Sequence, residues 1–130
     1  MNHNAAILCV DDEIIILDTV KEQLQRHFGE KYIYEVAEGV KEAWEIIEEL
    51  YESGVRILVI VSDWLMPGIK GDEFLIQVHQ KFPTIVTIML TGQADEAAVT
   101  HAKQEANLYA CLRKPWQESE LIDLIACALR

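Results

Sequence analysis

Five polar residues with complementary side chains each follow closely on a short apolar run. Asp11 and Asp12 follow one run, Asp63 a second, Thr91 a third and Lys114 a fourth. An apolar run without polar alternation is typical of a strand that is buried on both faces of a parallel sheet. A charge at the end of such a strand is costly unless it is solvated, paired or used. These five residues are therefore the candidates for a functional site.

Three carboxylates brought close together would favour a divalent cation and a phosphoryl group. At about 4 Å, two carboxylates repel each other by about 1 kcal/mol in water and about 4 kcal/mol at an effective dielectric constant of 20. Mg2+ relieves this repulsion, prefers oxygen ligands and is commonly held by one or two carboxylates together with a phosphate. A lysine ammonium and a threonine hydroxyl can bind phosphoryl oxygens, and an aspartate can itself become phosphorylated. The residue types therefore indicate phosphoryl chemistry assisted by Mg2+.

The elements that must position these residues alternate along the chain. Short apolar runs span residues 5–10, 32–36, 57–61, 85–90 and 108–112. Helical patterns span 14–28, 40–51, 74–82, 95–105 and 121–128, and the fourth of them is rich in alanine. Five strands alternating with five helices predict an α/β fold with a doubly wound parallel sheet, in which the carboxyl ends of the strands share one pocket. No linker or repeat interrupts the pattern, so we expect residues 1–130 to form a single domain.

Composition limits the partners of this chain. It has 130 residues, is 51% hydrophobic and has a formal net charge of −11, which suits one soluble globular domain. The acidic balance argues against direct binding of nucleic acid or of an anionic membrane, because both need clustered lysine and arginine. The three cysteines have no metal or redox spacing and predict reduced thiols, with Cys9 and Cys127 as small core residues. No signal peptide or membrane span is visible, so we expect a cytoplasmic protein.

Four short motifs resemble, in order and spacing, the receiver domain of two-component response regulators (CheY-like). They are Asp11-Asp12, Asp63 within DWLMPG, Thr91-Gly92 and Lys114-Pro115, and the resemblance covers essentially the whole chain. It implies a flavodoxin-like sheet with the strand order 2-1-3-4-5. It also implies that Asp63 accepts a phosphoryl group from a sensor histidine kinase, a phosphotransfer protein or a small phosphodonor. By the same resemblance, Mg2+ would be held by Asp11, Asp12, Asp63 and the backbone carbonyl of Leu65.

The resemblance further implies a phosphorylation-dependent switch that assists its own phosphorylation and dephosphorylation, and not an enzyme. Thr91 and Lys114 would contact the phosphoryl oxygens, and Lys114-Pro115 would be a cis peptide. The face made by the fourth helix, the fifth strand and the fifth helix would bind a downstream target or an output domain, or form a phosphorylation-dependent dimer. The sequence leaves open whether the chain acts alone or belongs to a longer regulator or hybrid kinase.

Three further positions bear on how the switch would work. The family usually carries Tyr or Phe three residues before the lysine, but this chain has Cys111 there, with Tyr109 on the same face of the strand. Either Tyr109 substitutes in part or the aromatic part of the switch is absent. We favour absence, because two residues displace a side chain by about 7 Å along a strand. Leu65 and Gln93 occupy the positions that tune dephosphorylation, and the apolar Leu65 predicts slow loss of the phosphoryl group.

Three other interpretations fit parts of the pattern. Asp11 and Asp12 could simply cap the first helix, because Asp is a favoured N-cap residue. A phosphatase or phosphotransferase that resembles the haloacid dehalogenase family would need a second acid two residues after its nucleophile, where this chain has Leu65. A receiver-like interaction module that is never phosphorylated would have no use for Asp63, Thr91 and Lys114 together with the acidic pair.

Overall fold

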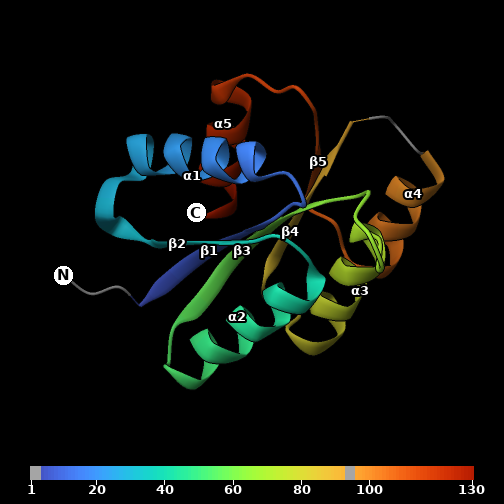
Figure 1. The fold of residues 1–130 in the computed structure, drawn as a ribbon, viewed down its shortest axis with the longest axis horizontal. Helices are drawn as coiled ribbons and strands as arrows, with labels where there is room; N and C mark the ends of the chain where they lie inside the picture. The colour runs from blue at the N-terminus through green and yellow to red at the C-terminus, as the bar shows by residue number, and fades with distance from the viewer. Residues whose placement is uncertain (1–3, 93–95) are drawn as a thin grey trace.

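Five parallel strands form the central sheet of the structure, a computed structural model that describes residues 4–92 and 96–130 (Figure 1). The strands are β1 (Ala5–Val10), β2 (Ile33–Ala37), β3 (Arg56–Asp63), β4 (Val86–Thr91) and β5 (Ala110–Arg113). Their order across the sheet is β2-β1-β3-β4-β5, and every neighbouring pair is parallel. The predicted doubly wound, flavodoxin-like α/β fold is thereby confirmed.

Helices cover both faces of this sheet (Figure 1). Helices α1 (Ile14–Phe28) and α5 (Glu118–Ala128) lie on one face. The opposite face carries α2 (Val40–Glu52), α3 (Gly71–Lys81) and α4 (Glu96–Glu105). A short 3-10 helix, η1 (Gly29–Lys31), follows α1 in the chain. Among the residues described, none of these helices has the length and apolar character needed to cross a membrane.

The two helical layers create two hydrophobic cores, and β3 contributes to both. Val61 of β3 packs in the core that contains Val20 of α1 and Leu121 of α5. Ile60, the preceding residue, packs in the other core with Phe74 of α3. Successive side chains of a strand point to opposite faces, so a strand covered on both sides needs apolar residues at every position. This explains why the run that leads to Asp63 shows no polar alternation.

Several element boundaries differ from the predicted ones. Strand β3 continues as far as Asp63, because Asp63 pairs in register with Leu90 of β4. Strand β5 begins only at Ala110, after Asn107 has adopted a positive φ of 50°. Helix α3 begins at Gly71, three residues before the first apolar position of its pattern. Apolar spacing marks buried positions only. It therefore does not locate the polar first turn of a helix such as α3, or the exact ends of an edge strand such as β5.

The cysteines behave as predicted at one position and differently at another. All three are free thiols, and Cys9 is buried as predicted. Burial, followed by the charge of Asp11, raises the pKa of the Cys9 thiol, so that it stays protonated. The prediction that Cys127 is a core residue was wrong, because its side chain is exposed. Cys127 lies two residues after the buried Ile125. Two residues correspond to a rotation of about 200° around the helix, so Cys127 points away from the core.

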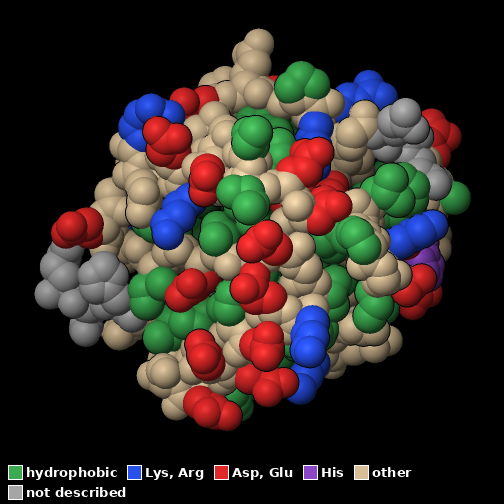
Figure 2. Space-filling model, in the orientation of Figure 1, with side chains coloured by type: hydrophobic (Ala, Val, Ile, Leu, Met, Phe, Trp, Pro, Cys, Tyr) green, Lys and Arg blue, Asp and Glu red, His purple; other side chains and the backbone are tan. Residues whose placement is uncertain are grey.

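Carboxylates gather on the surface over α2 (Figure 2). The exposed acidic residues of this helix are Glu42, Glu45, Glu48, Glu49 and Glu52. The opposite side of α2 carries the buried residues Ala43, Ile47 and Leu50, which pack toward the sheet. The acidic run is thus the solvated face of an amphipathic helix and contributes to the negative net charge.

Candidate functional site

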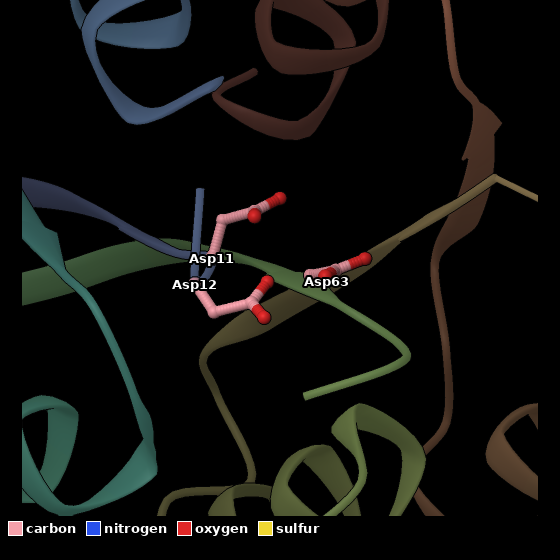
Figure 3. Close-up of side chains that lie close together, drawn as sticks. All are labelled: Asp11, Asp12 and Asp63. Carbon is pink, nitrogen blue, oxygen red and sulfur yellow. The ribbon is translucent and has the colours of Figure 1, made fainter. Parts of the chain in front are cut away.

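The carboxyl ends of β1 and β3 bring three carboxylates together (Figure 3). Asp63 is the last residue of β3, while Asp11 and Asp12 directly follow β1, the neighbouring strand. One carboxylate oxygen of each residue lies within 4.8 Å of those of the other two. Asp11 is fully buried and Asp63 is 6% exposed, whereas Asp12 is open to solvent. We call these three residues the acidic cluster; solvent reaches it on the side of Asp12.

Lys114 directly follows β5, and its side chain extends to the acidic cluster. Its Nζ lies 2.8 Å from Oδ2 of Asp11 and 3.1 Å from Oδ1 of Asp63. The lysine side chain is only 16% exposed, so these ion pairs are screened less than pairs on the surface. One ammonium beside three carboxylates still leaves the cluster negatively charged. A divalent cation would offset that remaining charge.

Burial changes the acid-base properties of the cluster. Desolvation raises the pKa of the Asp11 carboxyl, although the hydrogen bond from Lys114 opposes the change. Desolvation and then the charge of Asp11 raise the pKa of Asp63 as well. Burial by itself lowers the pKa of Lys114, but its hydrogen bonds and charge interactions with Asp11 and Asp63 raise that pKa overall. The two ionised carboxylates are thus in an unfavourable environment, which added positive charge would improve.

Thr91 ends β4 at the same edge of the sheet. It is 3% exposed, and its carbonyl oxygen accepts a hydrogen bond from the backbone N–H of Lys114 at 2.7 Å. The Lys114-Pro115 peptide bond is cis. The backbone therefore holds Thr91 and Lys114 as direct neighbours across the ends of β4 and β5.

Gly71 packs against the backbone of Asp63, a contact that the sequence did not indicate. A Cβ at position 71 would overlap the carbonyl oxygen of Asp63 and would lie 2.8 Å from its carbonyl carbon. The N–H of Gly71 donates to the carbonyl oxygen of Trp64 at 2.7 Å, so the loop after β3 closes directly onto the strand that carries Asp63. An isolated glycine between Lys70 and Asp72 resembles an ordinary loop residue, and only the fold reveals its position.

The geometry of Asp11 does not support the interpretation that the acidic pair caps the first helix. The N-cap residue of α1 is Glu13, and no side chain caps that end of the helix. Oδ1 of Asp11 accepts the backbone N–H of Glu13 at 2.9 Å, and its Oδ2 contacts Lys114. The Asp11 carboxylate is therefore held by the loop through one oxygen and by Lys114 through the other.

The match to known proteins agrees with this geometry. Residues 7–126 match the response regulator receiver domain family. The chain belongs to this family. Receiver domains serve two-component signal transduction, in which they are phosphorylated and switch conformation.

Several relatives of this receiver domain are much longer proteins. It is 33% identical over 125 residues to the hydrogenase transcriptional regulatory protein HoxA of Cupriavidus necator, an alignment that covers 96% of this chain and 24% of that protein. It is 30% identical over 122 residues to the sensor kinase CckA of Brucella abortus, covering 93% of this chain and 12% of that kinase. The receiver domain thus spans about a quarter of the length of the transcriptional regulators that it matches.

Solved structures of receiver domains superpose closely on this one. A CheY-like response regulator receiver domain protein from Methanospirillum hungatei is 29% identical with a TM-score of 0.83, covering 96% of this chain and 93% of that chain. The signal receiver domain of an HD domain-containing protein from Pseudomonas fluorescens is 26% identical with a TM-score of 0.85, covering 99% and 89% of the two chains.

The receiver domain carries no aromatic residue at the position where the family usually has one. Cys111 lies on β5 with its side chain exposed, and Tyr109 is 46% exposed just before that strand. The buried side chain of β5 is Leu112, which points to the opposite face from Cys111. Gln93, predicted to tune dephosphorylation, lies outside the described residues.

Exposed apolar side chains border the acidic cluster. At the start of α1, Ile14 is 57% exposed and Ile15 is 79% exposed. Leu65, two residues after Asp63, is 62% exposed. Three of the five large exposed apolar residues in the described part of the chain thus lie within three positions of the cluster along the sequence. We call Ile14, Ile15 and Leu65 the apolar rim; such surfaces commonly contact other proteins.

Proposed function

We propose that Asp63 accepts the phosphoryl group and that Mg2+ assists the reaction. The observation that carries this proposal is the grouping of Asp63 with Asp11, Asp12 and Lys114. Asp63 ends the middle strand of five, so a rigid sheet holds its carboxylate at the accessible cluster. The domain would be a switch that assists its own phosphorylation and dephosphorylation, rather than an enzyme with a separate substrate.

The acidic cluster suits Mg2+ by charge and by ligand type. Carboxylates together with a phosphate are a usual protein site for Mg2+, and the three oxygens within 4.8 Å of one another fit this pattern. Asp11, Asp12 and Asp63 would hold the ion, and the backbone carbonyl of Leu65 is the proposed further ligand. When bound, Mg2+ would neutralise negative charge on the carboxylates and on the phosphoryl group.

The proposed reaction is a displacement at phosphorus. An oxygen of the Asp63 carboxylate attacks the phosphorus of a phosphohistidine, and an O–P bond forms as the P–N bond breaks. The bonding electron pair leaves on the imidazole nitrogen of the donor. Lys114, whose Nζ lies 3.1 Å from Asp63, and the hydroxyl of Thr91 would bind the phosphoryl oxygens after transfer.

The phosphodonor is proposed to be a sensor histidine kinase or a phosphotransfer protein that docks on the apolar rim. A phosphohistidine side chain must approach the cluster from its accessible side, where Asp12 is exposed. Ile14, Ile15 and Leu65 flank the cluster along the chain and remain largely open to solvent. Burying such side chains at the centre of an interface is a common source of binding energy.

Replacing Ile15 by Ala is expected to lower the rate of phosphoryl transfer from a histidine kinase by about tenfold, because a well-buried interface side chain contributes 1 kcal/mol or more. The rate with acetyl phosphate should stay unchanged, since this small donor needs no docking surface. The matched control is Tyr51→Ala, which removes another exposed apolar side chain, one that is 65% exposed on α2. Equal kinase rates for wild type and Ile15→Ala would contradict the proposed docking surface.

The output is proposed to pass through the face formed by α4, β5 and α5. Helix α4 buries only two alanines, Ala98 and Ala102, and half-buries Val99, so displacing it exposes less apolar surface than displacing a helix with large buried side chains. Phosphorylation would draw Thr91 and Lys114 inward and bias an equilibrium between two positions of α4. The partner would be an output domain, a separate target or a second phosphorylated copy. The three free thiols suit a reducing compartment, and we place this signalling in the cytoplasm.

Replacing Leu65 by Asn is expected to shorten the lifetime of the phosphorylated domain by about threefold to tenfold, a change of about 1 kcal/mol in the barrier. The amide would hold a water molecule near the phosphoryl group, whereas the apolar leucine cannot. The measurement is the decay of the phosphorylated mass after removal of the donor, with Leu65→Met as the apolar control. An unchanged lifetime for Leu65→Asn would show that position 65 does not tune dephosphorylation. Gln93 is the second position for which we propose such a role.

The direct test of the proposed function is the intact mass of the domain after incubation with acetyl phosphate. With Mg2+ present, we expect a gain of one phosphoryl group, and a chelator should abolish the gain. If no gain appears with any donor, the domain is a receiver-like interaction module that is not phosphorylated.

A further inference from the structure

Asp72 is a buried carboxylate that lies outside the acidic cluster. It is the second residue of α3 and is 7% exposed. The partial positive charge at the start of a helix favours a carboxylate there, but burial removes most of its hydration. A buried carboxylate therefore depends on the polar groups that contact it.

The polar partner of Asp72 comes from α4. Nδ1 of His101 lies 3.4 Å from Oδ2 of Asp72. The other oxygen, Oδ1, is buried and has no hydrogen-bond partner among the described residues. The imidazole can donate Nδ1–H in its neutral form as well as when protonated. Asp72 depends on this contact more than His101 does, because the His101 side chain is 50% exposed and can be hydrated without Asp72.

Asp72 is also fixed relative to Asp63. The preceding residue, Gly71, packs on the carbonyl group of Asp63 and donates its N–H to Trp64 at 2.7 Å. The start of α3 therefore moves together with the end of β3. Helix α4, in contrast, buries only Ala98 and Ala102, so the contact joins a fixed element to a lightly packed one.

We propose that Asp72 is a positioning residue which, through His101, holds α4 in its position in the unphosphorylated domain. The inference rests on the proposed function, in which phosphorylation of Asp63 displaces α4. If α4 moves away, the buried carboxylate loses its polar partner, and this cost favours the undisplaced position. By linkage, the same contact must weaken binding of a phosphoryl group, or of a mimic, by an equal factor.

The test is a titration of the domain with beryllium fluoride in the presence of Mg2+, followed through the backbone amide signals of Thr91 and of α4. We compare wild type with His101→Ala, Asp72→Ala and the double variant, because alanine can neither donate nor accept the hydrogen bond. Each single variant is expected to bind the mimic about threefold to tenfold more tightly, as a lost contact of about 1 kcal/mol implies. The double variant should bind no more tightly than the single ones, because both remove the same contact.

Two controls separate this effect from a general loss of structure. Glu73→Gln removes a neighbouring, exposed charge from the first turn of α3, and it should bind the mimic as wild type does. In the unliganded His101→Ala variant, the α4 amide signals should lie part of the way toward their liganded positions, which a merely destabilised helix would not show.

The outcomes also distinguish this inference from the proposed function beneath it. If wild type binds the mimic but the variants bind with the same midpoint, the Asp72–His101 contact does not position α4 and the inference is overturned. If neither wild type nor any variant binds the mimic with Mg2+, the proposed phosphoacceptor site itself has failed.

Discussion

Replacing Asp63 by Asn is expected to abolish the gain of one phosphoryl group that wild type shows with acetyl phosphate and Mg2+. The asparagine amide has no charged oxygen to attack phosphorus, and it is a weaker ligand for Mg2+. Intact mass spectrometry after equal incubation of the two proteins measures the difference. We expect complete loss rather than a reduced rate, because Asp11 and Asp12 lie in the loop after β1 and not on the strand that presents Asp63.

The control for this prediction is Asp18→Asn, which removes an exposed carboxylate from α1 and should leave phosphorylation unchanged. Unfolding should not explain the loss in Asp63→Asn. Desolvation and the charge of Asp11 raise the pKa of Asp63 in the folded domain. At neutral pH the ionised carboxylate therefore lowers the free energy of unfolding. Asp63→Asn removes this charge, so the variant should be at least as stable as wild type. A phosphoryl group retained by Asp63→Asn would place the acceptor at another residue.

Replacing Gly71 by Ala is expected to lower the free energy of unfolding by about 3 kcal/mol or more. The added Cβ would overlap the carbonyl oxygen of Asp63. Neither atom can rotate away, because the backbone fixes the position of a Cβ and the carbonyl oxygen is itself part of the backbone. Steric overlap in a packed region costs typically 1–3 kcal/mol, and here the α3 start must also separate from β3. Urea denaturation of the two proteins measures the change.

Gly39→Ala is the matched control for the Gly71 prediction. Gly39 precedes α2 with an extended backbone, and a Cβ there would meet no atom within 4 Å, so we expect a change of about 1 kcal/mol or less. Phosphorylation of Gly71→Ala by acetyl phosphate should also be slower, because the overlap displaces the backbone of Asp63. If both glycine variants are equally stable, α3 is not fixed on β3 in the way described.

Sequence patterns predicted the architecture and the grouping of the candidate site residues because both depend on local signals. Unbroken apolar runs predict strands covered on both faces, and in a parallel sheet all their carboxyl ends meet at one edge. The sequence therefore predicts one pocket for five residues: Asp11, Asp12, Asp63, Thr91 and Lys114. The structure places all five at that edge and brings Lys114 to 2.8 Å from Asp11.

Contacts between residues far apart in the chain needed the tertiary structure. No local pattern relates Gly71 to the carbonyl of Asp63, or Asp72 to His101 of the next helix, since these contacts arise only when α3 packs beside β3 and α4. Asp72 lies 29 positions before His101, too far apart in the sequence for a local pattern to relate them. The exposure of Cys127 was missed for a related reason, because a helical pattern near its end does not show how far the apolar face extends.

Periodicity along the chain thus determined which elements form and which strand ends meet. The docking of one helix against its neighbours decided which individual side chains touch, because that depends on the relative placement of elements that no local pattern encodes.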